Sequence, residues 1–146
     1  MPMHAVDSQD QRRPRYRYVV NCDGAQMFVY ARSLATVVRI DGGVDAANAG
    51  QIAAEVRRFT KARTPLIIDL SHLDFLGIEG FQQLLALNHQ HQAAGLYCRI
   101  VTGVALRPLV RVVRDHGLPL VRSVPEALQL IEDALATRRQ APGMVR

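Results

Sequence analysis

The sequence has few of the features that mark secreted, redox-active or membrane-spanning proteins. Its two cysteines, Cys22 and Cys98, are far apart and form no C-x-x-C motif, so neither is expected to be catalytic and a reducing compartment would leave both as free thiols. No run of about eighteen apolar residues is present to cross a bilayer. The first residues carry charge without the apolar stretch of a secretory signal. We therefore expect a cytoplasmic protein with no membrane partner.

Motifs that bind phosphates or supply a nucleophile are also missing. There is no G-x-x-x-x-G-K-[ST] loop, no G-x-G-x-x-G fingerprint and no G-x-S-x-G elbow. His89 and His91 are i, i+2 on a predicted helix and would point in nearly opposite directions, so we expect two surface residues and no shared metal. Asp69 and Asp74 could pair as acid and base, but a strand-end aspartate commonly caps backbone N–H groups, and we favour that interpretation. We predict no catalytic residues, no cofactor and no metal.

What the sequence does contain indicates one α/β domain. Its 146 residues, 49% of them hydrophobic, suffice for one core and not for two. Residues 1–24 are polar and unpatterned, which predicts a loosely ordered arm that could include one short strand at 16–20. Residues 25–136 carry the periodic patterns of strands and helices. Residues 137–146 are predicted to be a flexible tail.

Strand and helix patterns alternate along residues 25–136. The β-branched runs 26–30 and 34–40, separated by Arg32-Ser33, predict a hairpin. The continuous apolar run 66–70 predicts a central strand covered on both faces. Further strands are predicted at 97–102 and 118–122, and helices after Asp45, after Gly77, around Pro108 and after Ser123. The alternation implies crossover connections, so we expect a mixed sheet of four to five strands with about four helices.

The excess of positive charge raises the question of nucleic-acid binding. Eighteen Lys and Arg stand against thirteen Asp and Glu, which gives a net charge of +5. Clustered arginines would neutralise phosphates, but most of these arginines lie near the two termini or among acidic residues. Only Arg107, Arg111 and Arg114 are spaced to share a helical face, and a solvated helix surface accounts for that face at least as well. Nucleic-acid binding is therefore the least favoured function.

Two stretches of the sequence resemble the motifs of one family. Residues 41–49, DGGVDAANA, are similar to the G-x-x-D-x-x-[NT] opening of the first helix in the STAS domain of anti-sigma-factor antagonists. Residues 66–80 are similar to the same family's V-x-x-D-L-S-x-V-x-F-[ILM]-D-S-S-G stretch. The resemblance spans about residues 26–135. It implies a small cytoplasmic α/β protein that binds an anti-sigma factor acting as a serine kinase, or a related regulator. The alternative is a scaffold or homo-oligomeric subunit with the same fold.

The sequence departs from this family at the residue that the kinase phosphorylates. Where the family carries Asp-Ser-Ser-Gly, this chain carries Gly77-Ile78-Glu79-Gly80, so the phosphorylatable serine corresponds to Glu79. A carboxylate has less charge and fewer acceptor oxygens than a phosphate, so Glu79 would imitate the phosphorylated state only in part. Alternatively, Glu79 only stabilises the helix N-terminus, which is worth about 0.3–1 kcal/mol. Both interpretations stay open.

The predicted partner-binding site combines the start of the first helix with the corner that precedes the second. Ile78 at the tip of this corner would serve as an apolar anchor. Gly77 would be a permissive N-cap, and Gly80 would let the corner lie close to a partner or to the sheet. The predicted site residues are Asp45, Asn48, Asp74, Phe75, Leu76, Gly77, Ile78, Glu79 and Gly80.

Overall fold

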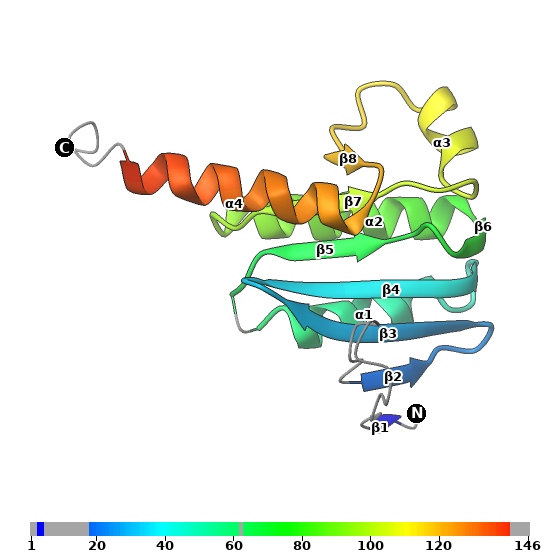
Figure 1. Cartoon of the computed structure of the whole chain (residues 1–146). Coiled ribbons are helices and arrows are strands. Elements are labelled where there is room, and N and C mark those ends of the chain that lie inside the picture. Colours follow the sequence, from blue (N-terminus) through cyan, green and yellow to red (C-terminus); the bar gives the residue numbers. More distant parts are fainter. Residues whose placement is uncertain (1–2, 5–17, 62, 141–146) are drawn as a thin grey trace.

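Eight strands of the described residues form a mixed sheet, which is the middle layer of the protein (Figure 1). The computed structural model describes residues 3–4, 18–61 and 63–140. The strands lie in the order β1-β2-β3-β4-β5-β7-β8, and β6 pairs with β4 outside this path. The predicted mixed α/β architecture is confirmed, but the sheet has more strands than the four to five expected. The additional strands are two to four residues long, which is too short for alternation to stand out in the sequence.

The strands and helices have the following bounds. The strands are β1 (Met3–His4), β2 (Tyr18–Asn21), β3 (Ala25–Arg32), β4 (Ala35–Val44), β5 (Leu66–Asp69), β6 (Leu73–Leu76), β7 (Cys98–Val101) and β8 (Leu120–Val121). The helices are α1 (Ala49–Phe59), α2 (Ile78–Ala93), α3 (Arg107–Val112) and α4 (Val124–Gln140).

The strand β4 organises the sheet. It forms the predicted hairpin with β3, from Ala25 opposite Gly42 to Arg32 opposite Ala35. On its other edge it pairs in parallel with β5, whose four residues are all buried, as predicted for a central strand. β4 continues four residues beyond its predicted end because Gly42, with a φ of 92°, accommodates an irregularity in register. Beyond that point β4 pairs with β6 instead of β5.

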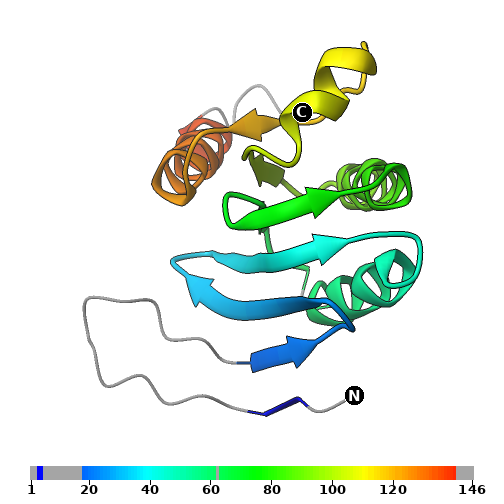
Figure 2. The same ribbon diagram turned by 90° about the vertical axis from the view of Figure 1, so that its right-hand side faces the viewer.

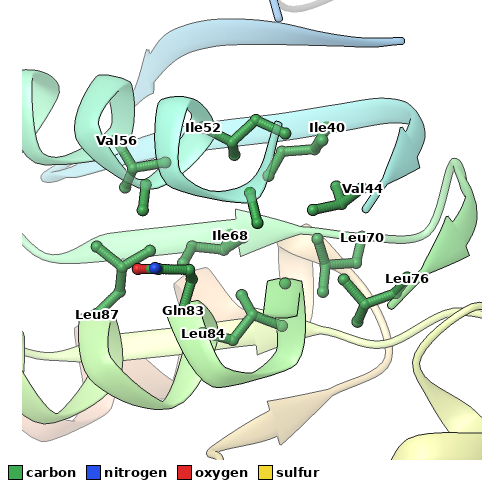
Figure 3. Close-up of a pocket in the computed structure, with 13 residues that line it drawn as sticks. Ile40, Val44, Ile52, Val56, Ile68, Leu70, Leu76, Gln83, Leu84 and Leu87 are labelled. Carbon is green, nitrogen blue, oxygen red and sulfur yellow. The ribbon is translucent and has the colours of Figure 1, made fainter. Parts of the chain in front are cut away.

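Helices cover both faces of the sheet, α1 and α2 on one and α4 on the other (Figure 2). Successive residues of β5 alternate between the two cores, as strand geometry requires: Ile68 faces α1 and α2, whereas Ile67 belongs to the cluster under α4. Figure 3 shows Ile68 between Val56 of α1 on one side and Leu84 and Leu87 of α2 on the other. An apolar cavity of about 20 Å³, room for roughly one water, remains between them.

The packed domain begins before residue 25 and ends after residue 136. β2 overlaps the short strand predicted at 16–20 within the arm, and it is not loosely ordered, because it pairs with β3 along its whole length. Val20 and Cys22 are buried in the larger core, because alternate residues of this segment face the helices. At the other end α4 continues to Gln140. The rest of the predicted arm and tail, residues 1–2, 5–17 and 141–146, lies outside the described residues.

Candidate functional site

The predicted corner lies at the carboxyl end of the sheet, where β6 leads into α2 (Figure 1). Backbone contacts fix it to the end of β4, because Leu76 pairs with Val44 and the N–H of Gly77 donates to the Val44 carbonyl at 2.8 Å. Gly77 is the N-cap of α2, as predicted, with extended backbone. The corner is therefore a rigid extension of the sheet.

Four side chains of this corner face solvent. Phe75 and Ile78 are large apolar residues with 56% and 47% of their surface exposed. Asp74 and Glu79 are exposed beside them. The corner thus presents two half-exposed apolar side chains on a rigid backbone, with two carboxylates next to them. We call Asp74, Phe75, Ile78 and Glu79 the docking corner.

Two further corner residues, Leu76 and Gly80, are buried and have a positioning role. Leu76 is 7% exposed and belongs to the core between the sheet and α2. A Cβ atom on Gly80 would lie 2.6 Å from Leu76 Cδ1 and 2.7 Å from Val44 Cγ1, closer than packed side chains allow. Gly80 therefore lets α2 approach the end of β4. Of the two roles predicted for Gly80, close approach to a partner or to the sheet, the structure supports the approach to the sheet.

Glu79 occupies the first turn of α2. Its carboxylate bends toward the helix start, since Oε1 lies 3.2 Å from the place where a Cβ of Gly77 would sit. Among the described residues the Glu79 side chain forms no hydrogen bond or ion pair. The position favours interaction with the helix dipole and also leaves the carboxylate accessible to a partner.

The turn before α1 is held by its own side chains. Asp45 Oδ1 accepts hydrogen bonds from the backbone N–H groups of Ala47 and Asn48, at 2.9 and 3.1 Å. Because this turn takes up residues 45–48, α1 begins at Ala49 and its N-cap is Asn48 rather than Asp45. Asp45 is exposed, and a partner can reach it.

Asn48 was predicted to contact a partner, but it is completely buried. Its Oδ1 accepts from the N–H of Asp45 at 2.9 Å, and its Nδ2 donates to the carbonyls of Asp23 and Gly43 at 3.0 and 2.9 Å. One side chain thereby joins the β2–β3 turn, the end of β4 and the start of α1. Asn48 positions the site and is not a surface that a partner meets.

Sequence reasoning missed the β2–β3 turn, which supplies one of these carbonyls. Asp23 and Gly24 both have positive φ, at 49° and 103°. An Asp-Gly pair between two strands is the usual composition of a tight hairpin turn. The dipeptide is a local signal for this turn, although the polar composition of residues 1–24 by itself favours a loosely ordered arm.

The remaining catalytic and charged candidates do not form a site. Asp69 Oδ1 accepts from the Ser71 backbone N–H at 3.0 Å and from Ser71 Oγ at 2.7 Å, which confirms the capping interpretation. His89 is exposed as predicted, but His91 is buried on the inner side of α2, where its Nε2 donates to the Thr64 carbonyl at 2.9 Å. Arg114 lies beyond the end of α3, so the three arginines share no continuous helical face.

Both cysteines are buried free thiols. Burial raises the pKa of Cys22 to about 11, and the negative charge of Glu55 acts in the same direction. Burial raises the pKa of Cys98 to about 12, although Arg99 opposes this shift. Both thiols therefore stay protonated at neutral pH. A nucleophile or a metal ligand would instead need to be a thiolate.

In the part of the chain that the structure describes, no three His, Cys, Asp or Glu side chains come together to hold a metal ion. The helices of the same ranges include none with the length and apolar character to cross a membrane.

Comparisons with known proteins place this geometry in a family. The model of the STAS domain matches residues 26–107. Osmosensory protein A of Mycobacterium tuberculosis is 38% identical over 126 residues, which cover 83% of this chain and 80% of that protein. The chain belongs to the STAS domain family.

Solved structures show the same fold. An anti-sigma factor antagonist from Mycobacterium paratuberculosis superimposes with a TM-score of 0.68 at 24% identity, over 76% of this chain and 97% of that one. The anti-sigma factor antagonist SpoIIAA in its unphosphorylated form gives 0.61 at 15% identity, over 73% and 96%. The fold of this chain is therefore that of the anti-sigma factor antagonists.

Proposed function

We propose that this chain is a non-enzymatic regulatory module that binds an anti-sigma factor, or a related serine-kinase regulator, through the docking corner and the neighbouring Asp45. The observation that carries the proposal is the half-exposed pair Phe75 and Ile78, held on fixed backbone next to the exposed carboxylates of Asp74 and Glu79. The fold shared with anti-sigma factor antagonists supports the class of partner.

The two apolar side chains provide the affinity. Complete burial of a large apolar side chain is worth about 1.5–3 kcal/mol, and about half of each is already covered in the free protein. The corner needs little ordering on binding, because backbone pairing to β4 already fixes it. Phe75 and Ile78 are therefore the anchors of the contact, and the carboxylates of Asp74 and Glu79 set its charge.

Glu79 gives this contact a permanent negative charge in place of a switchable one. The position offers no hydroxyl group that a kinase could phosphorylate. A carboxylate carries one negative charge, whereas a phosphate would carry about 1.5 to 2. We propose that Glu79 holds the module in a state that partly imitates phosphorylation and binds its partner weakly.

Titration calorimetry against an anti-sigma factor of the same organism tests the anchors. Ile78→Asp is expected to abolish measurable binding, because it places a desolvated charge in the contact. The matched control is Leu34→Asp at the β3–β4 turn, which lies at the opposite end of the sheet and is 57% exposed. Equal affinities for the wild type and both variants would show that the corner is not the docking surface and would favour a scaffold role.

The same titration separates the two interpretations of Glu79. If the carboxylate imitates phosphoserine, Glu79→Ser should strengthen binding at least several-fold and make the chain a kinase substrate. If it only stabilises the helix start, Glu79→Gln should lower stability by at most about 1 kcal/mol and leave affinity nearly unchanged. We expect the first result.

A further inference from the structure

A basic pocket lies at the amino end of the sheet, opposite the docking corner. It occupies about 330 Å³ between the C-terminal ends of α1 and α2. Its cations are Arg57, Lys61 and Arg63, and its apolar part consists of Leu66, Leu87 and Leu96. No carboxylate lines it, and among the described residues none of the three cations forms an ion pair. Three uncompensated positive charges in a concave site concentrate anions.

The two guanidinium groups are held in place by α2. Arg57 Nε donates to Gln90 Oε1 at 3.0 Å, and Arg63 donates from one terminal nitrogen to the Ala94 carbonyl at 3.2 Å. Each guanidinium has five N–H donors, so most of them remain available for a ligand. Arg63 also has a φ of 58°, a conformation uncommon for a residue other than glycine.

The balance of charge indicates what kind of anion fits. Both helices end at this pocket, and each C-terminus contributes about half a negative charge, which opposes an anion. The three cationic side chains minus the two helix C-termini leave a net charge of roughly two positive units in the pocket. A carboxylate would neutralise about half of that, whereas a phosphomonoester carries about 1.5 to 2 negative charges. Guanidinium forks also match the geometry of phosphate oxygens.

We propose that this pocket binds a phosphomonoester group, with Arg57, Lys61 and Arg63 on the phosphate and the leucines against the adjoining apolar part of the ligand. The volume is that of a small-ligand site. The phosphate could belong to a soluble metabolite or to a lipid headgroup, and the recognition chemistry is the same for both. The site is independent of the docking corner.

NMR titration of the full chain at low ionic strength tests the proposal, with inorganic phosphate and phenyl phosphate as probes. Both probes are expected to give saturable amide shifts at residues 57–66 and 87–96, and phenyl phosphate is expected to bind more tightly because of the leucines. Arg57→Gln and Arg63→Gln should each weaken binding at least about fivefold. Arg58→Gln is the matched control, because Arg58 adjoins Arg57 but pairs with Glu55 outside the pocket.

The control should change affinity by less than about twofold. Co-sedimentation with phosphatidic acid vesicles distinguishes the two sources of the phosphate: Arg57-dependent binding assigns a lipid headgroup, and binding of the soluble probes alone assigns a metabolite. Three results would overturn the proposal: no saturation by either soluble probe, shifts centred elsewhere, or equal losses in Arg57→Gln and Arg58→Gln.

Discussion

The two ends of the sheet are built in different ways. At the carboxyl end, backbone pairing to β4 and the buried amide of Asn48 fix the docking corner. At the amino end, Arg57 and Arg63 are long side chains, each placed by one hydrogen bond to α2. The first end is a rigid surface of apolar and acidic side chains, and the second is an adjustable basic one. Substitutions of the positioning residues at the carboxyl end should therefore alter stability, whereas substitutions of Arg57 or Arg63 at the amino end should alter binding and leave stability nearly unchanged.

The largest effect is expected from Asn48→Ala. The change leaves the N–H of Asp45 and the carbonyls of Asp23 and Gly43 without their partner in a partly buried site, at a cost of about 2–3 kcal/mol. Denaturant unfolding measures this loss. Asn21→Ala, which removes only an exposed hydrogen bond to Gln26, should cost less than about 0.5 kcal/mol. A loss below about 1 kcal/mol for Asn48→Ala would refute the role assigned to its amide.

A pair of glycines tests the close packing at the same end. Gly80→Ala places a methyl group against Leu76 and Val44 and should destabilise the protein by about 1–3 kcal/mol. Gly50→Ala in α1 meets no atom within 4 Å and should stabilise it by about 0.5–1 kcal/mol. Thermal and denaturant unfolding of both variants provide the comparison. The same sign for the two changes would contradict the packing described for α2.

The two buried thiols, one near each end of the sheet, should make stability depend on pH. Cys22 adjoins the β2–β3 turn, and Cys98 begins β7 at the amino end. Because folding raises both pKa values above the ordinary value of 9, to about 11 and about 12, their contribution is complete below pH 9 and is lost as pH rises toward those values. We expect stability to fall by about 1 kcal/mol per thiol between about pH 8 and 10.

Denaturant midpoints measured under reducing conditions at several pH values check this decline. The double variant Cys22→Ala with Cys98→Ala should show a shallower dependence on pH, whatever its absolute stability. An unchanged slope in that variant would assign the decline to other groups.

The smallest effect is expected at the amino end. Arg57→Gln removes a partly exposed hydrogen bond and no ion pair, so the free energy of unfolding should change by less than about 0.5 kcal/mol in phosphate-free buffer. Added phosphate should stabilise the wild type more than this variant, since a ligand stabilises only the state that binds it. A large loss of stability without phosphate would mean that the amino end is held together by its arginines.

Sequence reasoning succeeded where a feature depends on residues close together in the chain. The β3–β4 hairpin, the buried strand β5 and the Gly77 cap each follow from a local pattern of apolar residues, turns or glycines. The STAS motifs likewise lie in two continuous stretches, which is why they could be recognised.

The features that could not be predicted depend on distant contacts. β6 is a strand only because the end of β4 extends past β5 and offers it an edge. The burial of Asn48 requires the carbonyl of Asp23 from another hairpin. The basic pocket joins residues 57–66 to residues 87–96, and neither segment alone differs from an ordinary charged helix end.

The extended strand β4 also implies an order of assembly during folding. Its pairing with β3 closes through a two-residue turn, a step of about 1–10 μs in isolated hairpins. The pocket at the amino end has to wait for α2 to cross over and dock, which requires slower closure of a longer loop. We therefore expect Val38→Ala in β4 to slow folding in stopped-flow experiments, and Leu96→Ala in the pocket mainly to accelerate unfolding. A chain emerging from the ribosome would then complete the hairpin before the residues of the pocket could meet.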